Sequence, residues 1–187
     1  MASVGRAGGS TTQSFASTVW RQQANDFLRA YVEALRAAGL EDRVIAYQVG
    51  AGNTSEWVKG DLSMDEVCPD FSAPMRRHFR QWLRTRYDGD THALRAAWAD
   101  ADVDFGSAEV PSAEAQLNTC DFTFRDPVRE MAVIDFYRCL AELCGDLIID
   151  FCQTIKQATD GQALTGAFFG YLMELAWNKS FFGVGTQ

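Results

Sequence analysis

An apolar, β-branched run at residues 44–49 breaks abruptly into glycines and small polar residues at 50–55. A short run of this kind is typical of a buried strand, and the glycines after it are typical of a loop leaving the strand's end. A second run covers residues 163–169 and ends in glycine and aromatic residues. Each run follows a helical pattern after a short connection, which predicts an α/β fold.

Helical patterns occupy most of the remaining chain. Apolar residues spaced by three or four predict helices over about 18–38, 72–87 and 91–98, with Ser72 and either Asp90 or Thr91 as caps. The longest pattern, 127–159, spans about nine turns, and its apolar stripe is interpreted as core. Residues 99–119 lack a clear period and predict a long irregular connection.

The composition indicates one domain with a real core, because 47% of the 187 residues are hydrophobic. Residues 1–13 are rich in glycine and serine and predict a flexible lead. Residues 14–187 then form the domain. Two predicted strands do not close an α/β sheet, so we expect a section of a larger fold or a chain that needs a partner for its edges.

Charge and cysteine usage exclude several classes of function. The net charge of −8 gives no basic footprint for nucleic acid and suits anionic membranes poorly. No apolar run is long enough for a spanning helix, and the first residues lack the pattern of a signal peptide. Five cysteines without a C-x-x-C pair predict a reducing, cytoplasmic location.

The sequence has no pattern that favours a metal or cofactor site. Only two histidines, His78 and His92, are present, which excludes a histidine-rich metal site. The sequence has neither a glycine-rich phosphate loop nor a serine within G-x-S-x-G. We therefore expect no metal and no cofactor.

The loop after the first predicted strand carries one carboxylate, Glu56, beside an indole, Trp57. In α/β proteins, ligands bind beyond the carboxyl ends of the strands. A glutamate held there against an aromatic surface is a candidate general acid. The alternative is a solvated loop carboxylate next to a half-buried tryptophan, and the local sequence leaves both interpretations open.

The chain resembles glycoside hydrolases of the β-galactosidase-like kind, family 42 and its (β/α)₈-barrel relatives. The resemblance rests on the order and spacing of several stretches, since no single motif is diagnostic. These stretches are 14–21, 44–57, 70–83, 93–98, 110–111, 124–127 and 166–172.

The resemblance implies a helix-rich, partial (β/α)₈ TIM barrel, holding about strands 4 to 5 with their flanking helices. It makes Glu56 the acid/base at the end of strand 4, and it puts the nucleophile on strand 7, expected beyond Gln187. Family members usually carry asparagine directly before the acid/base glutamate. Here Ser55 stands at that position and Asn53 lies three positions before Glu56, so Asn53 is a candidate sugar contact.

The substrate that the resemblance implies is a carbohydrate. Trp57, Phe168 and Tyr171 follow the two predicted strands and are candidates for stacking on the apolar faces of sugars. The alternative for each is plain core packing. Glu174 is another carboxylate near a strand end, and we interpret it as solvated rather than catalytic.

Two hypotheses of different class follow. The first is a segment of a retaining glycoside hydrolase that carries the acid/base Glu56 but no nucleophile, and that is inactive alone because hydrolysis with retention needs two carboxyl groups. The second is a non-catalytic carbohydrate-binding or structural module. That module would complete its fold with a partner, or by self-association through the unpaired edges of the barrel.

Overall fold

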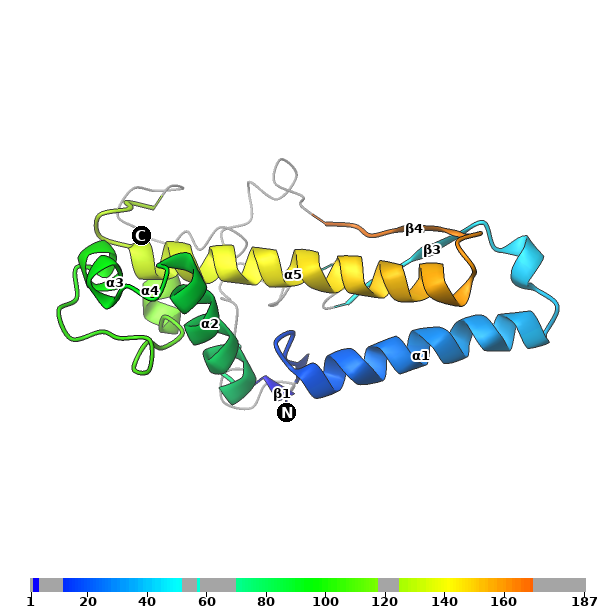
Figure 1. Ribbon diagram of the computed structural model, residues 1–187, viewed down its shortest axis with the longest axis horizontal. Helices are drawn as coiled ribbons and strands as arrows, with labels where there is room; N and C mark the ends of the chain where they lie inside the picture. Colours follow the sequence, from blue (N-terminus) through cyan, green and yellow to red (C-terminus); the bar gives the residue numbers. More distant parts are fainter. Residues whose placement is uncertain (1, 4–11, 52–56, 58–69, 118–124, 170–187) are drawn as a thin grey trace.

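The computed structural model describes residues 2–3, 12–51, 57, 70–117 and 125–169, and it is built around two long helices (Figure 1). Helix α1 (Thr18–Ala37) lies beside the C-terminal half of α5 (Met131–Ala158), and both run in the same direction. Strands β3 (Ala46–Gln48) and β4 (Leu164–Gly166) return along these helices. The predicted helix-rich α/β character is confirmed, because each of these strands follows one of the long helices.

Strands β3 and β4 form a two-stranded parallel sheet in which Ala46 pairs with Leu164 and Gln48 with Gly166. Hydrogen bonds from Leu164 N to Ile45 O and from Val49 N to Gly166 O, both 2.9 Å, lie at its two ends. Both predicted strands are therefore confirmed, though each is shorter than its apolar run. A second sheet pairs β1 (Ala2–Ser3) with β2 (Thr12–Gln13) in the antiparallel sense.

Capping residues set the ends of α1 and of the next two helices. Ser17 accepts from Trp20 N at 3.2 Å at the start of α1, and Gly39, at φ +66°, follows its end. Ser72 caps α2 (Ala73–Arg86), and Asp90 caps α3 (Thr91–Trp98). A 3₁₀ turn, η1 (Glu41–Arg43), joins α1 to β3. The sequence predicts these helices to within one or two residues, which is the ordinary uncertainty of a helix end.

The start of α5 corrects the sequence analysis, which predicted a helix from residue 127. Residues 127–129 form a turn instead, and α5 begins at Met131. The Asp126 carboxylate accepts from Val128 N at 2.8 Å, while its carbonyl accepts from the backbone N–H of Glu130 at 2.8 Å. The Glu130 carboxylate accepts from Asp126 N at 2.8 Å. These bonds close a separate turn, because aspartate side chains favour local turns over helix interiors.

The stretch 99–119 also contains more regular structure than the sequence predicts. Helix α4 (Ala113–Leu117) lies within it, and the Ser112 hydroxyl accepts from Ala115 N at 3.1 Å as a cap. Earlier in the stretch, the Asp104 carboxylate accepts from Gly106 N at 2.6 Å and Ser107 N at 2.7 Å. Local side-chain bonds of this kind order a chain without producing a hydrophobic period.

The apolar stripe of α5 forms the core, as the sequence predicts. Helices α2 and α3 pack on its N-terminal half and α1 on its C-terminal half (Figure 1). The buried α5 side chains at the centre of this packing are Val133, Phe136, Cys139, Leu143, Cys144, Leu147, Phe151 and Ile155.

Polar side chains fix the register between α1 and α5. The Asp150 carboxylate accepts from Arg21 Nε at 2.7 Å and from Asn25 Nδ2 at 2.8 Å. One turn further along, the Thr154 hydroxyl donates to Asn25 Oδ1 at 2.6 Å. Asn25 and Thr154 are both buried, so a slip of either helix would leave these groups unpaired.

Among the helices of the described residues, none has the length and apolar character needed to cross a membrane.

Candidate functional site

The carboxyl ends of β3 and β4 lie at the same edge of the sheet, because the strands are parallel. Val49 continues the pairing past β3 by donating to Gly166 O. The loops that carry the predicted site residues leave from this edge. In open α/β sheets, this is the edge at which ligands bind.

Trp57 lies against the end of β3. Its indole Nε1 donates to Val49 O at 3.1 Å, and its side chain is only 4% exposed. The rings of Phe15 and Phe151 pack against it, each with its centroid 5.7 Å from that of the indole. These contacts place Trp57 in the core, with no open face for a sugar in this arrangement, and they hold the end of the 50–57 loop at the strand.

Phe168, the predicted aromatic residue after β4, is 53% exposed. Ala163 and Thr165 are turned toward the helices, whereas Leu164 is 65% exposed. Because side chains alternate along a strand, Leu164 and Phe168 share the face of the sheet that the helices do not cover. Phe168 thus lies, about half exposed, on this face just beyond the carboxyl end of β4.

Four other residues singled out by the sequence lie outside the described residues: Asn53, Ser55, Glu56 and Tyr171. The same holds for Glu174. Glu56 is nevertheless bonded directly to Trp57, whose position at the end of β3 is known. The acid role of Glu56 stays a prediction.

Two buried carboxylates that the sequence analysis did not single out have structural partners. Asp70 accepts from the hydroxyls of Ser14 at 2.8 Å and Ser72 at 2.7 Å, and so ties the chain before α1 to the start of α2. Asp135 accepts from the Tyr87 hydroxyl at 2.6 Å and from Trp98 Nε1 at 2.9 Å, through the same oxygen. Both carboxylates are 0% exposed, so substrate does not reach them.

No group of three or more metal-ligating side chains gathers within the described ranges. Three cysteines in that part of the chain, Cys139, Cys144 and Cys152, are free thiols. Burial raises the pKa of Cys139 to about 12, so this thiol stays protonated and is not a nucleophile at neutral pH.

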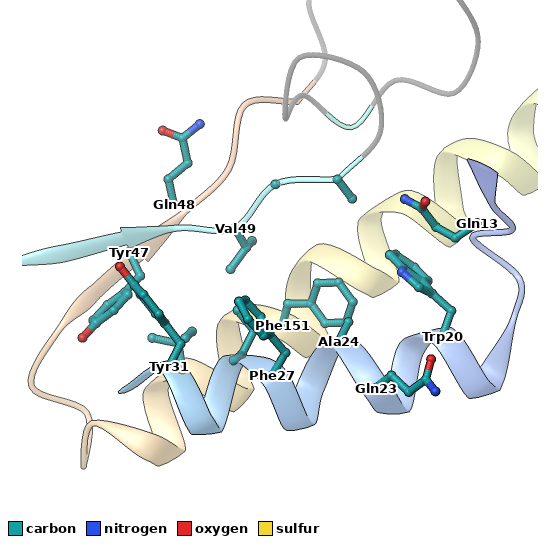
Figure 2. Close-up of a pocket in the computed structure, with 14 residues that line it drawn as sticks. Gln13, Trp20, Gln23, Ala24, Phe27, Tyr31, Tyr47, Gln48, Val49 and Phe151 are labelled. Atoms are coloured by element: carbon teal, nitrogen blue, oxygen red, sulfur yellow. The ribbon is translucent and has the colours of Figure 1, made fainter. Parts of the chain in front are cut away.

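A groove of about 610 Å³ lies between α1 and β3 (Figure 2). One wall is the α1 row of Trp20, Ala24, Phe27 and Tyr31, and the other is the end of β3. Its floor includes Phe151 and Ile155 of α5. The groove is larger than a single side chain and mostly apolar, which is typical of binding sites.

The apolar residues of α1 divide into two rows, which the sequence pattern alone does not separate. Val32 is buried and Leu28 half-buried against the core, whereas Phe27 and Tyr31 are 67% and 48% exposed. The rings of Phe27 and Tyr31 stack with centroids 6.3 Å apart, and Tyr31 meets Tyr47 of β3 edge-on at 6.4 Å. The apolar residues of α1 cover a wider stripe of the helix than one contact face needs. This width was the sequence feature that could have predicted the second surface.

Among the described side chains that line the groove, Tyr47 has a buried hydroxyl without a hydrogen-bond partner. Within the described residues its oxygen has no hydrogen bond, and burial raises its pKa. A buried phenol without a partner is a cost to the fold or a donor for a bound group.

Comparison with models of protein families and with curated proteins finds no match for this chain.

Proposed function

We propose that the chain is a segment of a retaining, β-galactosidase-like glycoside hydrolase in which Glu56 delivers and recovers the proton. The observation that carries this proposal is the position of Trp57, whose indole is fixed to Val49 O at the end of β3. Glu56 immediately precedes Trp57 in the sequence, and the edge that Trp57 contacts is the one where α/β enzymes bind substrate. The finer assignment of β3 and β4 to strands 4 and 5 of a (β/α)₈ barrel belongs to the same proposal.

The chemistry of retention defines what Glu56 would do. It would protonate the leaving oxygen of the glycosidic bond while a second carboxylate attacks the anomeric carbon from a position about 5–5.5 Å away. It would then deprotonate the water that releases the sugar. A proton donor of this kind needs a raised pKa. The residue that follows Glu56, Trp57, packs with Phe15 and Phe151 in an apolar cluster, and such a surface would disfavour charge on a carboxylate held against it.

Substitution of Glu56 by glutamine tests the acid role in a polypeptide that also supplies the second carboxylate. We expect Glu56→Gln to lower kcat/KM for an alkyl β-galactoside by roughly 10²–10⁴, the usual contribution of general acid catalysis. For an aryl galactoside with an activated leaving group the loss should be much smaller, because its departure needs no proton. Initial rates on both substrates measure the difference.

Glu33→Gln provides the matched control, since Glu33 is an exposed carboxylate on α1. This variant should leave both rates unchanged. Equal losses on the alkyl and aryl substrates after Glu56→Gln would contradict a proton-donating role.

The second candidate is a non-catalytic carbohydrate-binding or structural module that completes its fold with a partner or by self-association. The observation that favours it is the sheet itself, which has two strands and two open edges in the part of the chain that is described. Parallel sheets are ordinarily covered on both faces, and two strands alone are marginal in water.

A further inference from the structure

Helix α2 carries a concentration of positive charge in an acidic chain. It holds five of the 17 basic residues and none of the 25 acidic ones. The buried side chains of α2 are apolar and pack against the N-terminal half of α5 (Figure 1). Most of the arginines therefore lie on the part of the helix surface that faces away from this contact. This arginine face consists of Arg76, Arg77, Arg80 and Arg84.

Contacts with the segment 105–108 hold two of these arginines in place. The Arg84 guanidinium lies over the ring of buried Phe105, 5.5 Å from its centroid. Arg80 Nε donates to Ala108 O at 2.7 Å. A guanidinium that is already ordered loses less conformational entropy when it binds an anion.

The arginine face keeps a net positive charge. Among the described residues, only Glu109 forms ion pairs with it, at 2.5 Å from Arg80 and 3.6 Å from Arg76. The Glu109 side chain is 54% exposed, so solvent screens these pairs. Arg77 and Arg84 form no ion pair within that part of the chain.

The positions of these arginines work against the helix that carries them. Arg80 lies four residues from both Arg76 and Arg84, and like charges at this spacing destabilise a helix. Arg76 and Arg77 also lie near the N-terminal end of α2, where the helix dipole disfavours positive charge. Departures from local preference of this kind are expected at functional sites. An anion bound to the arginine face would relieve both costs.

The arginine face is short and is bordered by acidic residues. Arg77 and Arg84 are two helical turns apart, about 10.5 Å along the helix axis. Exposed Asp88 and Asp90 follow the end of α2, and Glu109 lies on one flank. A nucleic acid duplex or an anionic membrane would bring further negative charge against these carboxylates. An extended peptide, in contrast, covers the distance with about three residues.

We propose that the arginine face of α2 binds an acidic segment of a partner protein, whose carboxylates pair with Arg77 and Arg84. The planar guanidinium can bind a carboxylate through two parallel N–H···O bonds. The positive charge of the face makes the occupant acidic, and the short length of the face favours a peptide segment over a long polyanion. The inference does not depend on either candidate function.

Fluorescence anisotropy of a fluorescein-labelled octaglutamate peptide, titrated with the full chain, tests the proposal. We expect binding that weakens as sodium chloride is raised from about 50 to about 300 mM, because salt screens exposed charges. An octaglutamine peptide with the same label should not bind.

A double variant tests which arginines bind the peptide. Arg77→Gln with Arg84→Gln should weaken the binding of octaglutamate by at least about tenfold, because it removes both proposed carboxylate partners. Arg29→Gln with Arg43→Gln is the matched control, since it removes the same charge from exposed arginines on α1 and η1. The control should bind like the wild type. Circular dichroism checks that both double variants retain their helices.

Several outcomes would overturn the proposal. Octaglutamate that does not bind at about 50 mM salt would show that the arginine face is only solvated. An equal loss of binding in the control variant would show an effect of net charge rather than of this face.

Three further measurements test the class of partner. Duplex DNA, or vesicles containing phosphatidylserine, should bind more weakly than octaglutamate at the same salt concentration. Equal or tighter binding of either would contradict a peptide partner. A chain that dimerises alone in sedimentation velocity, and loses this in Arg77→Gln with Arg84→Gln, would make the occupant a second copy and the proposal wrong. None of these outcomes bears on Glu56, whose test is the rate comparison.

Discussion

At the scale of single residues, Asp135 is a buried carboxyl group that is hydrogen-bonded through one of its two oxygens. One carboxylate oxygen accepts from both Tyr87 and Trp98, and the residue is fully buried on α5. A buried carboxylate that loses a donor is left partly unpaired, which costs about 1–3 kcal/mol. We expect Tyr87→Phe to lower the free energy of unfolding by roughly this amount in urea titrations at pH 7.

The hydrogen bond between Tyr87 and Asp135 also predicts how the stability of the fold changes at alkaline pH. Burial, followed by the bond to Asp135, raises the pKa of Tyr87 above its ordinary value of 10.0. A tyrosine that ionises more readily unfolded than folded contributes stability below pH 10 that is lost as the pH rises further. The stability difference between wild type and Tyr87→Phe should therefore shrink above pH 10. A difference that stays constant would contradict the raised pKa.

Tyr47 differs from Tyr87 in lacking a hydrogen-bond partner, so Tyr47→Phe is a control for Tyr87→Phe. Its hydroxyl is buried without a hydrogen-bond partner among the described residues. Tyr47→Phe removes a desolvated group and no bond, so we expect unfolding free energy to be unchanged or slightly higher. Urea titration at low protein concentration measures it. A loss as large as that of Tyr87→Phe would show that this hydroxyl has a partner in solution.

At the scale of elements, the alignment of α1 with α5 depends on a few polar contacts. Asn25 donates to Asp150 and accepts from Thr154 in the buried seam between the helices. Asn25→Ala leaves the Thr154 hydroxyl without its acceptor and should cost about 2 kcal/mol. Gln22→Ala removes only an exposed bond to Asp26 and should stay within about 0.5 kcal/mol of wild type.

The same seam predicts how stability changes in acid. The bond from Arg21, with a further contribution from Asn25, lowers the pKa of Asp150 below its usual range. A carboxylate with a lowered folded pKa stabilises the fold above the unfolded pKa, and this contribution is lost as the pH falls. Asp150→Asn should therefore unfold with a shallower dependence on pH below about pH 5 than the wild type.

Sequence periodicity predicts the helices well because their apolar stripes and caps are local features. Ser72, Asp90 and the α5 stripe lie where the pattern puts them. The start of α5 was wrong because Asp126 and Glu130 bond to each other's backbone, a local competition that apolar spacing does not register. Short α4 was missed for a similar reason, since five residues are too few to show a period.

The candidate site was predictable only in part. The apolar runs and the glycines that follow them locate both strand ends, and parallel pairing brings these ends together. Trp57 contacts Phe15 and Phe151, which come from two other segments of the chain. The spacing of residues within one segment cannot predict such a contact. The groove could not be predicted from the sequence either, because the exposure of Phe27 and Tyr31 depends on where α5 and β3 pack against α1.

At the scale of the whole molecule, α5 is the element on which the others pack. Helices α1, α2 and α3 all contact it, and its buried side chains run through the core. We expect a chain truncated after residue 125 to lose cooperative unfolding, because the remaining helices then have no shared apolar partner. Far-UV circular dichroism during urea titration tests this, and a sigmoidal transition in the truncated chain would contradict it.

The contacts between α1 and α5 also bear on how the protein is made. Arg21 and Asp150 lie 129 positions apart in the chain. At ordinary ribosomal speeds, about 5–20 residues per second, α1 leaves the exit tunnel roughly 6–26 s before its partner leaves it. Through that interval the apolar rows of α1 are open to water and to other nascent chains, so chaperone capacity during translation should govern the yield of folded protein.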